Sequence, residues 1–312
     1  MIATVFPGQG SQKPGMGQEL YDAFEVVRKT FEMVSEATGL SANKICFELD
    51  EETLRQTQNA QLALYTCGVA AYRVLSDQGV RATGFAGHSV GEYAALAAAG
   101  VLSVGDGARL VQRRGDLMAR SGTLRQGGMA AILGLERDAL EAVCLQASSI
   151  NEVAVIANDN CPGQLVISGD KIAVDRAGAL AGEAGAKRVL PLNVSGAFHS
   201  PLMEEAAGAM GEALKLVSFE TSVNAVYANV TAAAQADSAG WPGLLEAQLK
   251  SPVRWTESIR TMVDDGFSMF VECGVGEVLC GLIKRIDREA RTLSVHDSAS
   301  LERTQTEFAT AI

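Results

Sequence analysis

The sequence contains no apolar run that approaches the ~20 residues an α-helix needs to cross a bilayer. Its apolar first residues follow no basic segment, so they lack the pattern of a secretory signal. None of its six cysteines belongs to a Cys-x-x-Cys pair or stands at metal-ligand spacing from a histidine. We therefore expect a cytoplasmic protein with free thiols, no membrane span and no metal site.

The sequence also has fewer positive than negative charges: 26 lysines and arginines against 37 aspartates and glutamates, which gives a net charge of −11. Nucleic-acid binding needs a basic surface, so we expect no nucleic-acid partner. The sequence has no Walker motif and no His-Glu-x-x-His motif, and Gly8 and Gly10 are followed by Lys13 where a dinucleotide fingerprint requires glycine. We therefore expect no nicotinamide, flavin or metal cofactor.

What the sequence does contain is an alternation of strand-like and helix-like segments, which is typical of an α/β protein. Residues 127–195 follow the order β-α-β-β-α-β of a ferredoxin-like unit. We predict a large, hydrolase-like α/β domain with a parallel sheet, formed by residues 1–126 and 196–312, and an inserted small ferredoxin-like domain of residues 127–195. Predicted strands cover residues 2–6, 84–87, 129–133, 153–157, 165–168 and 187–192, with others near 226 and 269. Predicted helices cover residues 18–37, 61–78, 92–99, 106–120, 137–146 and 172–183, with others near 201, 255 and 278.

Residues 87–91 (GHSVG) form a Gly-x-Ser-x-Gly pattern between a predicted buried strand and an alanine-rich helix. A serine on such a turn stands clear of the backbone, and the glycines let the turn close without side-chain clashes. The backbone N–H of Val90 and the positive end of the helix would face an oxyanion formed next to Ser89. The pattern indicates a nucleophilic serine, although a serine in an ordinary turn would match it too.

A nucleophilic serine needs a base, and the chain has three histidines. His88 is adjacent to Ser89 on a sharp turn and should point away from it, so we expect it to support the turn. His296 is expected at the surface, at the end of a strand. His199 lies in a loop between a predicted strand and helix, where catalytic groups often occur, so elimination favours it over a purely structural histidine.

Arg114 interrupts the apolar face of the helix predicted over residues 106–120. A buried guanidinium needs a partner, preferably a carboxylate held by two parallel hydrogen bonds. That carboxylate could be an Asp or Glu of the protein, or it could belong to the substrate. The apolar neighbours on the face are Leu110, Val111, Leu117 and Met118.

Five motifs occur together and in order: FPGQGSQ at residues 6–12, GHSVGE at 87–92, QRRG at 112–115, AFHS at 197–200 and SPVRW at 251–255. Together they resemble the malonyl-CoA:acyl-carrier-protein transacylases of bacterial fatty acid synthesis, and the likeness extends to about residue 285. It implies transfer of malonyl from malonyl-CoA to the phosphopantetheine thiol of an acyl carrier protein through a malonyl-serine. It also implies that no metal or bound cofactor is needed.

The resemblance assigns roles to matching positions. Ser89 would be the nucleophile and His199 its base. The main-chain carbonyl of Gln248 would orient the histidine, which explains the lack of an Asp for a Ser-Asp-His triad. The backbone N–H groups of Gln9 and Val90 would form the oxyanion hole.

The substrate site is implied in the same way. Arg114 would hold the malonyl carboxylate, in agreement with its place on the helix. Met118 would line the acyl pocket, and Phe198 is typical of malonyl-selective members. Asn160, in the predicted hairpin turn of the small domain, would face the cleft. Val275 replaces a proline common in the family and Val90 a leucine, but only the N–H of Val90 is used, so its role should survive.

Three alternatives stay open from the sequence. The same chemistry could serve a polyketide synthase or a malonate decarboxylase. A serine hydrolase or thioesterase would use water in place of the carrier thiol, although Arg114 disfavours a plain fatty chain. A catalytically silent carrier-binding module is disfavoured by the intact Ser89 and His199. The sequence gives no indication of oligomeric state.

Overall fold

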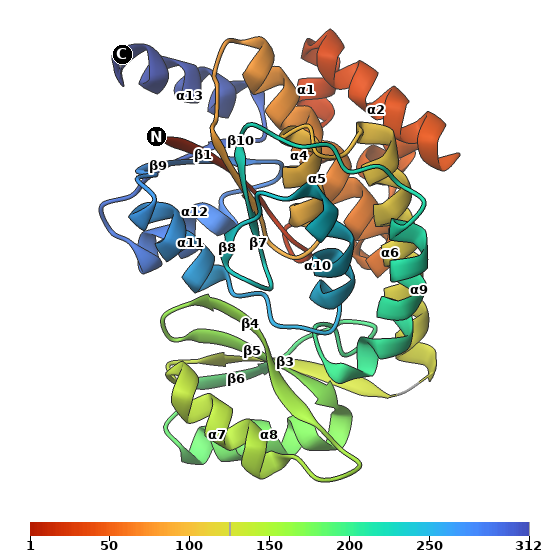
Figure 1. Cartoon of the computed structure of the whole chain (residues 1–312), viewed down its shortest axis with the longest axis vertical. Coiled ribbons are helices and arrows are strands. Elements are labelled where there is room, and N and C mark those ends of the chain that lie inside the picture. Colours follow the sequence, from red (N-terminus) through yellow and green to blue (C-terminus); the bar gives the residue numbers. More distant parts are fainter. Residues whose placement is uncertain (125, 312) are drawn as a thin grey trace.

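The computed structural model describes residues 1–124 and 126–311, which form two sheets lying one above the other in Figure 1. The larger sheet has the strand order β10-β9-β1-β2-β7-β8, and its pairs are parallel except for β7 and β8. The carboxyl ends of adjacent parallel strands meet at one edge of a sheet, so the loops after β1, β2 and β7 come together. The strands are β1 (Ile2–Phe6), β2 (Gly84–Gly87), β7 (Ala225–Ala228), β8 (Ala233–Ala234), β9 (Met269–Cys273) and β10 (Arg291–Val295).

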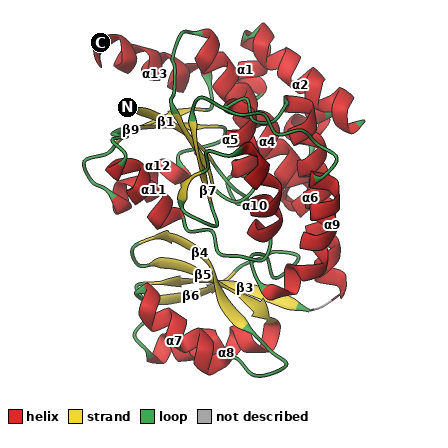
Figure 2. Cartoon of the chain, viewed as in Figure 1, coloured by secondary structure: helices red, strands yellow, loops and turns green. Residues whose placement is uncertain are grey.

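Helices cover the larger sheet (Figure 2). The helix α4 (Thr57–Asp77) is buried along most of its length, because small and apolar side chains occur on all its faces. By contrast, α6 (Val104–Leu124) has one buried and one exposed face, as predicted. The other helices here are α1 (Gln18–Ala23), α2 (Glu25–Thr38), α3 (Glu51–Arg55), α5 (Gly91–Ala98), α9 (Glu204–Leu214), α10 (Trp241–Gln248), α11 (Trp255–Asp264), α12 (Val278–Ile286) and α13 (Ser298–Ala311), with shorter helical turns at Lys44–Glu48, Pro201–Met203 and Ser238–Gly240.

The second sheet is antiparallel, with the order β4-β5-β3-β6. Its apolar core is built largely from its own side chains, Ile132, Leu140 and Ile167 among them. This arrangement confirms the predicted fold class, an α/β sheet with a separate β-α-β-β-α-β unit, while the domain boundaries at 126/127 and 195/196 stay a prediction. The elements of the unit are β3 (Gly127–Leu133), α7 (Arg137–Ala147), β4 (Ala154–Cys161), β5 (Gln164–Asp170), α8 (Lys171–Glu183) and β6 (Arg188–Pro191).

The single helix predicted over residues 18–37 is wrong, because the chain leaves the helical conformation at Phe24 (φ −124°, ψ 128°) and forms α1 and α2. The guanidinium of Arg28 donates to the carbonyl oxygens of Tyr21 and Asp22 at 2.9 and 3.0 Å. These bonds satisfy carbonyls that the end of a helix leaves without partners, which allows the break.

The hairpin turn predicted over residues 158–163 is too long, since β4 continues to Cys161 with two register shifts. The backbone of Val253 supplies the missing partners. Its N–H donates to Ala157 O at 2.9 Å, and its carbonyl accepts from Asp159 N at 2.9 Å. The strand is thereby extended along the larger unit.

His296, predicted at the surface, is partly buried, with 17% of its side chain exposed. It follows β10, and the hydroxyl of Ser300 accepts a hydrogen bond from its N–H at 3.0 Å, which folds the next residues back over it. The six cysteines are free, as predicted, and all six are buried. In residues 1–124 and 126–311, no helix is both long and apolar enough to pass through a membrane.

Candidate active site

Ser89 lies at the turn between β2 and α5, where its backbone has a positive φ of 53°. This conformation is uncommon for a residue with a side chain. Close packing requires the flanking glycines: a Cβ on Gly87 would lie 1.9 Å from the carbonyl carbon of Gly91, and a Cβ on Gly91 would lie 2.2 Å from Phe6 O. The Gly-x-Ser-x-Gly pattern therefore forms a constrained strand–turn–helix and not an ordinary turn.

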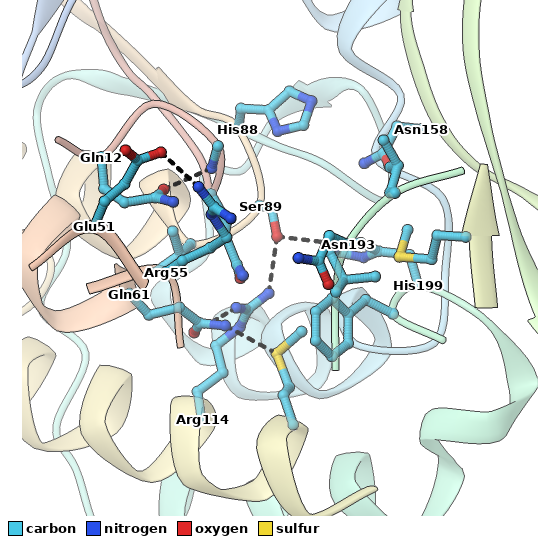
Figure 3. Close-up of a pocket in the computed structure, with 18 residues that line it drawn as sticks. Gln12, Glu51, Arg55, Gln61, His88, Ser89, Arg114, Asn158, Asn193 and His199 are labelled. Carbon is cyan, nitrogen blue, oxygen red and sulfur yellow. Dashed lines mark hydrogen bonds and ion pairs between the residues drawn. The ribbon is translucent and has the colours of Figure 1, made fainter. Parts of the chain in front are cut away.

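His199 approaches Ser89 from the loop before Pro201–Met203, with Nε2 at 2.8 Å from the serine Oγ (Figure 3). Its Nδ1 lies 2.8 Å from the main-chain oxygen of Gln248 and 3.2 Å from that of Ser251, so Nδ1 carries the hydrogen and Nε2 is the acceptor. Burial, helped by the charge of Arg114, lowers the pKa of His199 to about 3. The imidazole is therefore neutral and oriented to accept the serine proton.

His88 does not contact the serine hydroxyl. Its Nε2 lies 2.8 Å from Asn160 Oδ1, and its ring centroid is 5.7 Å from that of Trp255. Burial lowers the pKa of His88, so the ring is neutral. These contacts suit the supporting role predicted for His88. Asn160 was predicted to face the cleft, and its side-chain oxygen lies within hydrogen-bond distance of His88.

Arg114 is fully buried and contacts the same hydroxyl from another side. Its Nη2 donates to Ser89 Oγ at 3.0 Å and to Gln248 Oε1 at 2.9 Å, and its Nη1 donates to Gln61 Oε1 at 2.7 Å. Its Nε is buried with no partner, and no carboxylate of the described residues lies within ion-pair distance of the guanidinium. The partner of Arg114 could have been a carboxylate of the protein or one of the substrate, and the described part of the chain supplies none. The guanidinium therefore keeps unused hydrogen-bonding capacity.

A cleft of about 390 Å³ opens over Ser89 between the two units. Met118, predicted to line an acyl pocket, and Phe198, predicted as a substrate-binding residue, both line it. From the second unit, Asn158 lines it and Asn160 does not. Its wall from the large unit includes Gln9, Gly10, Gln12, Glu51, Arg55, Gln61, His88, Val90, Arg114 and His199, and its wall from the other side includes Met129, Leu192, Asn193 and Val194.

Gln9 and Val90, whose backbone N–H groups are predicted to form the oxyanion hole, both line this cleft, and Val90 directly follows Ser89 in the chain. Within the described residues, neither N–H donates a backbone hydrogen bond. Val90 also precedes the first turn of α5, where the helix dipole adds positive potential. Two free amides beside a nucleophile can stabilise an oxyanion, which is the use predicted for them.

Sequence reasoning missed three buried polar residues of the site. Asn229 follows β7 and accepts a hydrogen bond from Ser89 N at 2.8 Å through Oδ1, while its Nδ2 donates to Gly87 O at 2.7 Å. Gln61 holds Arg114, and Glu92 accepts a hydrogen bond from the side chain of Gln248. The signal for Asn229 was its place directly after the strand that neighbours β2, which brings it to the edge where Ser89 lies.

A His199→Asn variant is expected to lose less stability on acidification than the unchanged chain. In the unfolded chain this histidine titrates near its ordinary pKa of ~6.5, but in the folded protein its pKa is about 3. Between these values the unfolded state binds one more proton, so the free energy of unfolding falls as the pH falls. From pH 7 to pH 5 the unchanged chain should lose about 2 kcal/mol that the variant keeps.

Urea unfolding of both proteins at the two pH values measures this difference. Asparagine tolerates the left-handed backbone at this position, where φ is 57°, so the substitution adds little strain. Equal losses of stability in the two proteins would contradict the low pKa of His199.

The chain as a whole is similar to known proteins. Residues 4–312 match the family described as acyl transferase domain. The malonyl CoA-acyl carrier protein transacylase of Bacillus subtilis (strain 168) is 41% identical over 301 residues, which cover 96% of this chain and 95% of the relative.

Solved structures agree. An acyl carrier protein S-malonyltransferase from Vibrio cholerae superposes with a TM-score of 0.93 and 42% identity, covering 97% of this chain and 99% of its own. A malonyl-transacylase in complex with its type II PKS acyl-carrier protein has a TM-score of 0.93 and 38% identity, covering 98% of this chain and 99% of its own.

Proposed function

Because this chain belongs to the family of malonyl-CoA–acyl carrier protein transacylases, we propose that it moves malonyl from coenzyme A to the phosphopantetheine thiol of an acyl carrier protein through an ester on Ser89. One observation carries this proposal: a base and a cation meet the same hydroxyl. His199 Nε2 lies 2.8 Å from Ser89 Oγ, and Arg114 Nη2 lies 3.0 Å from it. A buried cation without a carboxylate partner next to a nucleophile suits an acyl group that itself ends in a carboxylate.

In the first half-reaction, the malonyl carboxylate binds the guanidinium of Arg114 in the cleft. Ser89 Oγ attacks the thioester carbonyl carbon while His199 Nε2 takes its proton. The N–H groups of Gln9 and Val90 stabilise the tetrahedral oxyanion. When the carbon–sulfur bond breaks, the proton on His199 passes to the departing sulfur, and coenzyme A leaves with a free thiol.

In the second half-reaction, the same groups act in reverse order. The thiol of the carrier-bound phosphopantetheine gives its proton to His199 and attacks the ester on Ser89. The serine oxygen then leaves and recovers the proton. Every proton and acyl transfer uses side chains and backbone amides of the chain, so we propose that no metal or resident cofactor takes part.

The same chemistry would suit carrier proteins of other pathways, including a polyketide synthase or a malonate decarboxylase. We propose fatty acid synthesis as the pathway because all five motifs resemble that group. A serine hydrolase is the rival of another class, and water would then replace the carrier thiol. The buried guanidinium favours a substrate with a carboxylate but does not itself choose between thiol and water. A cytoplasmic location stays a prediction.

Intact-mass measurement tests the proposal. Incubation with malonyl-CoA is expected to add one malonyl group to the protein, with peptide mapping placing it on Ser89. Carrier protein with its phosphopantetheine arm should remove the group and gain it, whereas the same carrier without the arm should leave the adduct in place. Steady release of coenzyme A and malonate without carrier would point to a hydrolase, and no adduct with no release would contradict acyl transfer.

A further inference from the structure

Glu92 is a buried acid in the first turn of α5, three residues after Ser89 in the chain. Only 1% of it is exposed, and burial raises the pKa of its carboxyl to about 7. Burial of a carboxylate is costly unless its oxygens accept hydrogen bonds. In the described part of the chain it forms no ion pair within 4.0 Å, so its hydrogen-bond partners indicate what it does.

The first carboxylate oxygen holds the loop that supports the nucleophile. Glu92 Oε1 accepts a hydrogen bond from the backbone N–H of Asn229 at 3.0 Å. The side chain of Asn229 in turn accepts from the N–H of Ser89 and donates to the carbonyl of Gly87. Because φ of Ser89 is positive, these bonds help to hold a conformation that the residue would otherwise rarely adopt.

The second oxygen accepts from Gln248 Nε2, which also donates to Ser89 O at 3.0 Å. The other end of the same amide, Oε1, accepts from Arg114 Nη2 at 2.9 Å. Because a carboxylate needs a donor and a guanidinium needs an acceptor, Gln248 can satisfy both in this one orientation. The main chain of the same residue accepts from His199 Nδ1 at 2.8 Å.

We propose that Glu92 is a positioning residue for malonyl transfer, which holds Ser89 through Asn229 and holds His199 and Arg114 through Gln248. The inference rests on the roles proposed above for these three residues. Glu92 does not contact the guanidinium itself, so its effect on Arg114 passes through the side-chain amide of Gln248. The guanidinium therefore stays in place and is left without a protein carboxylate, so a substrate carboxylate can bind it.

Glu92→Gln tests this role because it keeps the shape of the side chain but replaces one acceptor oxygen with a donor. That donor would face either Gln248 Nε2 or Asn229 N–H, so one of the two supports must be lost. The matched control is Glu272→Gln. Glu272 on β9 is also fully buried, burial raises its pKa to about 7, and it accepts a hydrogen bond from Cys280 N at 2.8 Å. Unlike the residues that Glu92 contacts, Glu272 does not line the cleft or bond to a residue that does.

The readouts are kcat/KM for malonyl-CoA, the same quantity for acetyl-CoA, and the melting temperature. We expect Glu92→Gln to lower kcat/KM for malonyl-CoA about 10- to 100-fold. The malonyl-to-acetyl ratio, which is kcat/KM for malonyl-CoA divided by kcat/KM for acetyl-CoA, should fall about tenfold below that of the unchanged chain. Glu272→Gln should change stability but leave the ratio unchanged. A structural role alone would reduce transfer of both acyl groups by the same factor.

An unchanged malonyl-to-acetyl ratio in folded Glu92→Gln protein would overturn the proposal. If that variant does not fold, Gln248→Met carries the test, because it removes the side-chain bridge and keeps the carbonyl that accepts from His199. It must lower the ratio in the same way. If both fold, the double variant should lower the ratio no further than Gln248→Met alone, since Glu92 acts on Arg114 through Gln248.

Whether malonyl-CoA labels Ser89 of the unchanged chain shows which proposal has failed, the positioning role of Glu92 or the proposed function itself. If malonyl-CoA labels Ser89 of the unchanged chain but Glu92→Gln behaves like the control, the positioning role is wrong and the proposed function stands. If the unchanged chain is never labelled, the proposed function fails first.

Discussion

A Ser89→Ala variant is expected to lose kcat/KM for malonyl transfer by about 10⁴- to 10⁶-fold, because the reaction then has no covalent intermediate. His199 and the amides of Gln9 and Val90 would remain, but the hydroxyl that lies 2.8 Å from His199 Nε2 would be missing. Transfer from malonyl-CoA to the carrier, followed by mass spectrometry of the carrier, measures the loss. The protein itself should carry no malonyl group.

Ser168→Ala is the matched control for this variant. Ser168 is fully buried, its hydroxyl has no hydrogen-bond partner among the described residues, and it lies on β5 in the second sheet. Removal of this hydroxyl should leave transfer within about twofold, because Ser168 does not line the cleft over Ser89. If Ser89→Ala retained transfer within tenfold of the unchanged chain, the nucleophile would have to be another residue.

An Arg114→Gln variant is expected to lose kcat/KM for malonyl-CoA by about 10²- to 10³-fold, because a buried charge partner of the substrate carboxylate is removed. Glutamine keeps part of the side-chain volume, and burial excludes water that could replace the cation. Acetyl-CoA carries no carboxylate, so its kcat/KM should change by less than about tenfold. The malonyl-to-acetyl ratio, measured with both thioesters, therefore falls sharply.

Arg113→Gln controls for the loss of charge on the same helix, since Arg113 is exposed on the opposite face of α6. It should leave the ratio unchanged. Equal losses for malonyl-CoA and acetyl-CoA in Arg114→Gln would mean that the guanidinium serves Ser89, to which it donates at 3.0 Å, and not the substrate carboxylate.

The sequence was most informative where a short stretch of chain determines the geometry. The spacing of Gly87, Ser89 and Gly91 marks a turn that admits no larger flanking residue, and the structure has that turn. The one cation on the apolar face of residues 106–120 likewise identified Arg114 before any contact was known. Both signals are local, because helical periodicity and turn sterics operate over a few residues.

It was least informative where the geometry depends on contacts between distant segments. Gln61 has no local feature that distinguishes it from other polar residues of a helix. Glu92 ends the GHSVGE motif, but the motif does not show its partners. The roles of both residues come from contacts with residues far along the chain. The place of Asn158 in the cleft wall was not predicted, for a different reason. Two register shifts in β4 change which side chains face the cleft, and bulges of this kind leave no clear trace in the pattern.

The reacting groups and part of the cleft wall come from different sheets, and this separation affects how the protein can change during evolution. The nucleophile, the base, the cation and both amides all come from the unit of the larger sheet, whereas the second unit has its own core and contributes wall residues such as Met129 and Asn158. Substitutions in the second unit can therefore reshape the cleft with few consequences for the reacting atoms. Such substitutions could change which acyl groups or carrier proteins are accepted, while the reacting groups on the larger sheet stay the same.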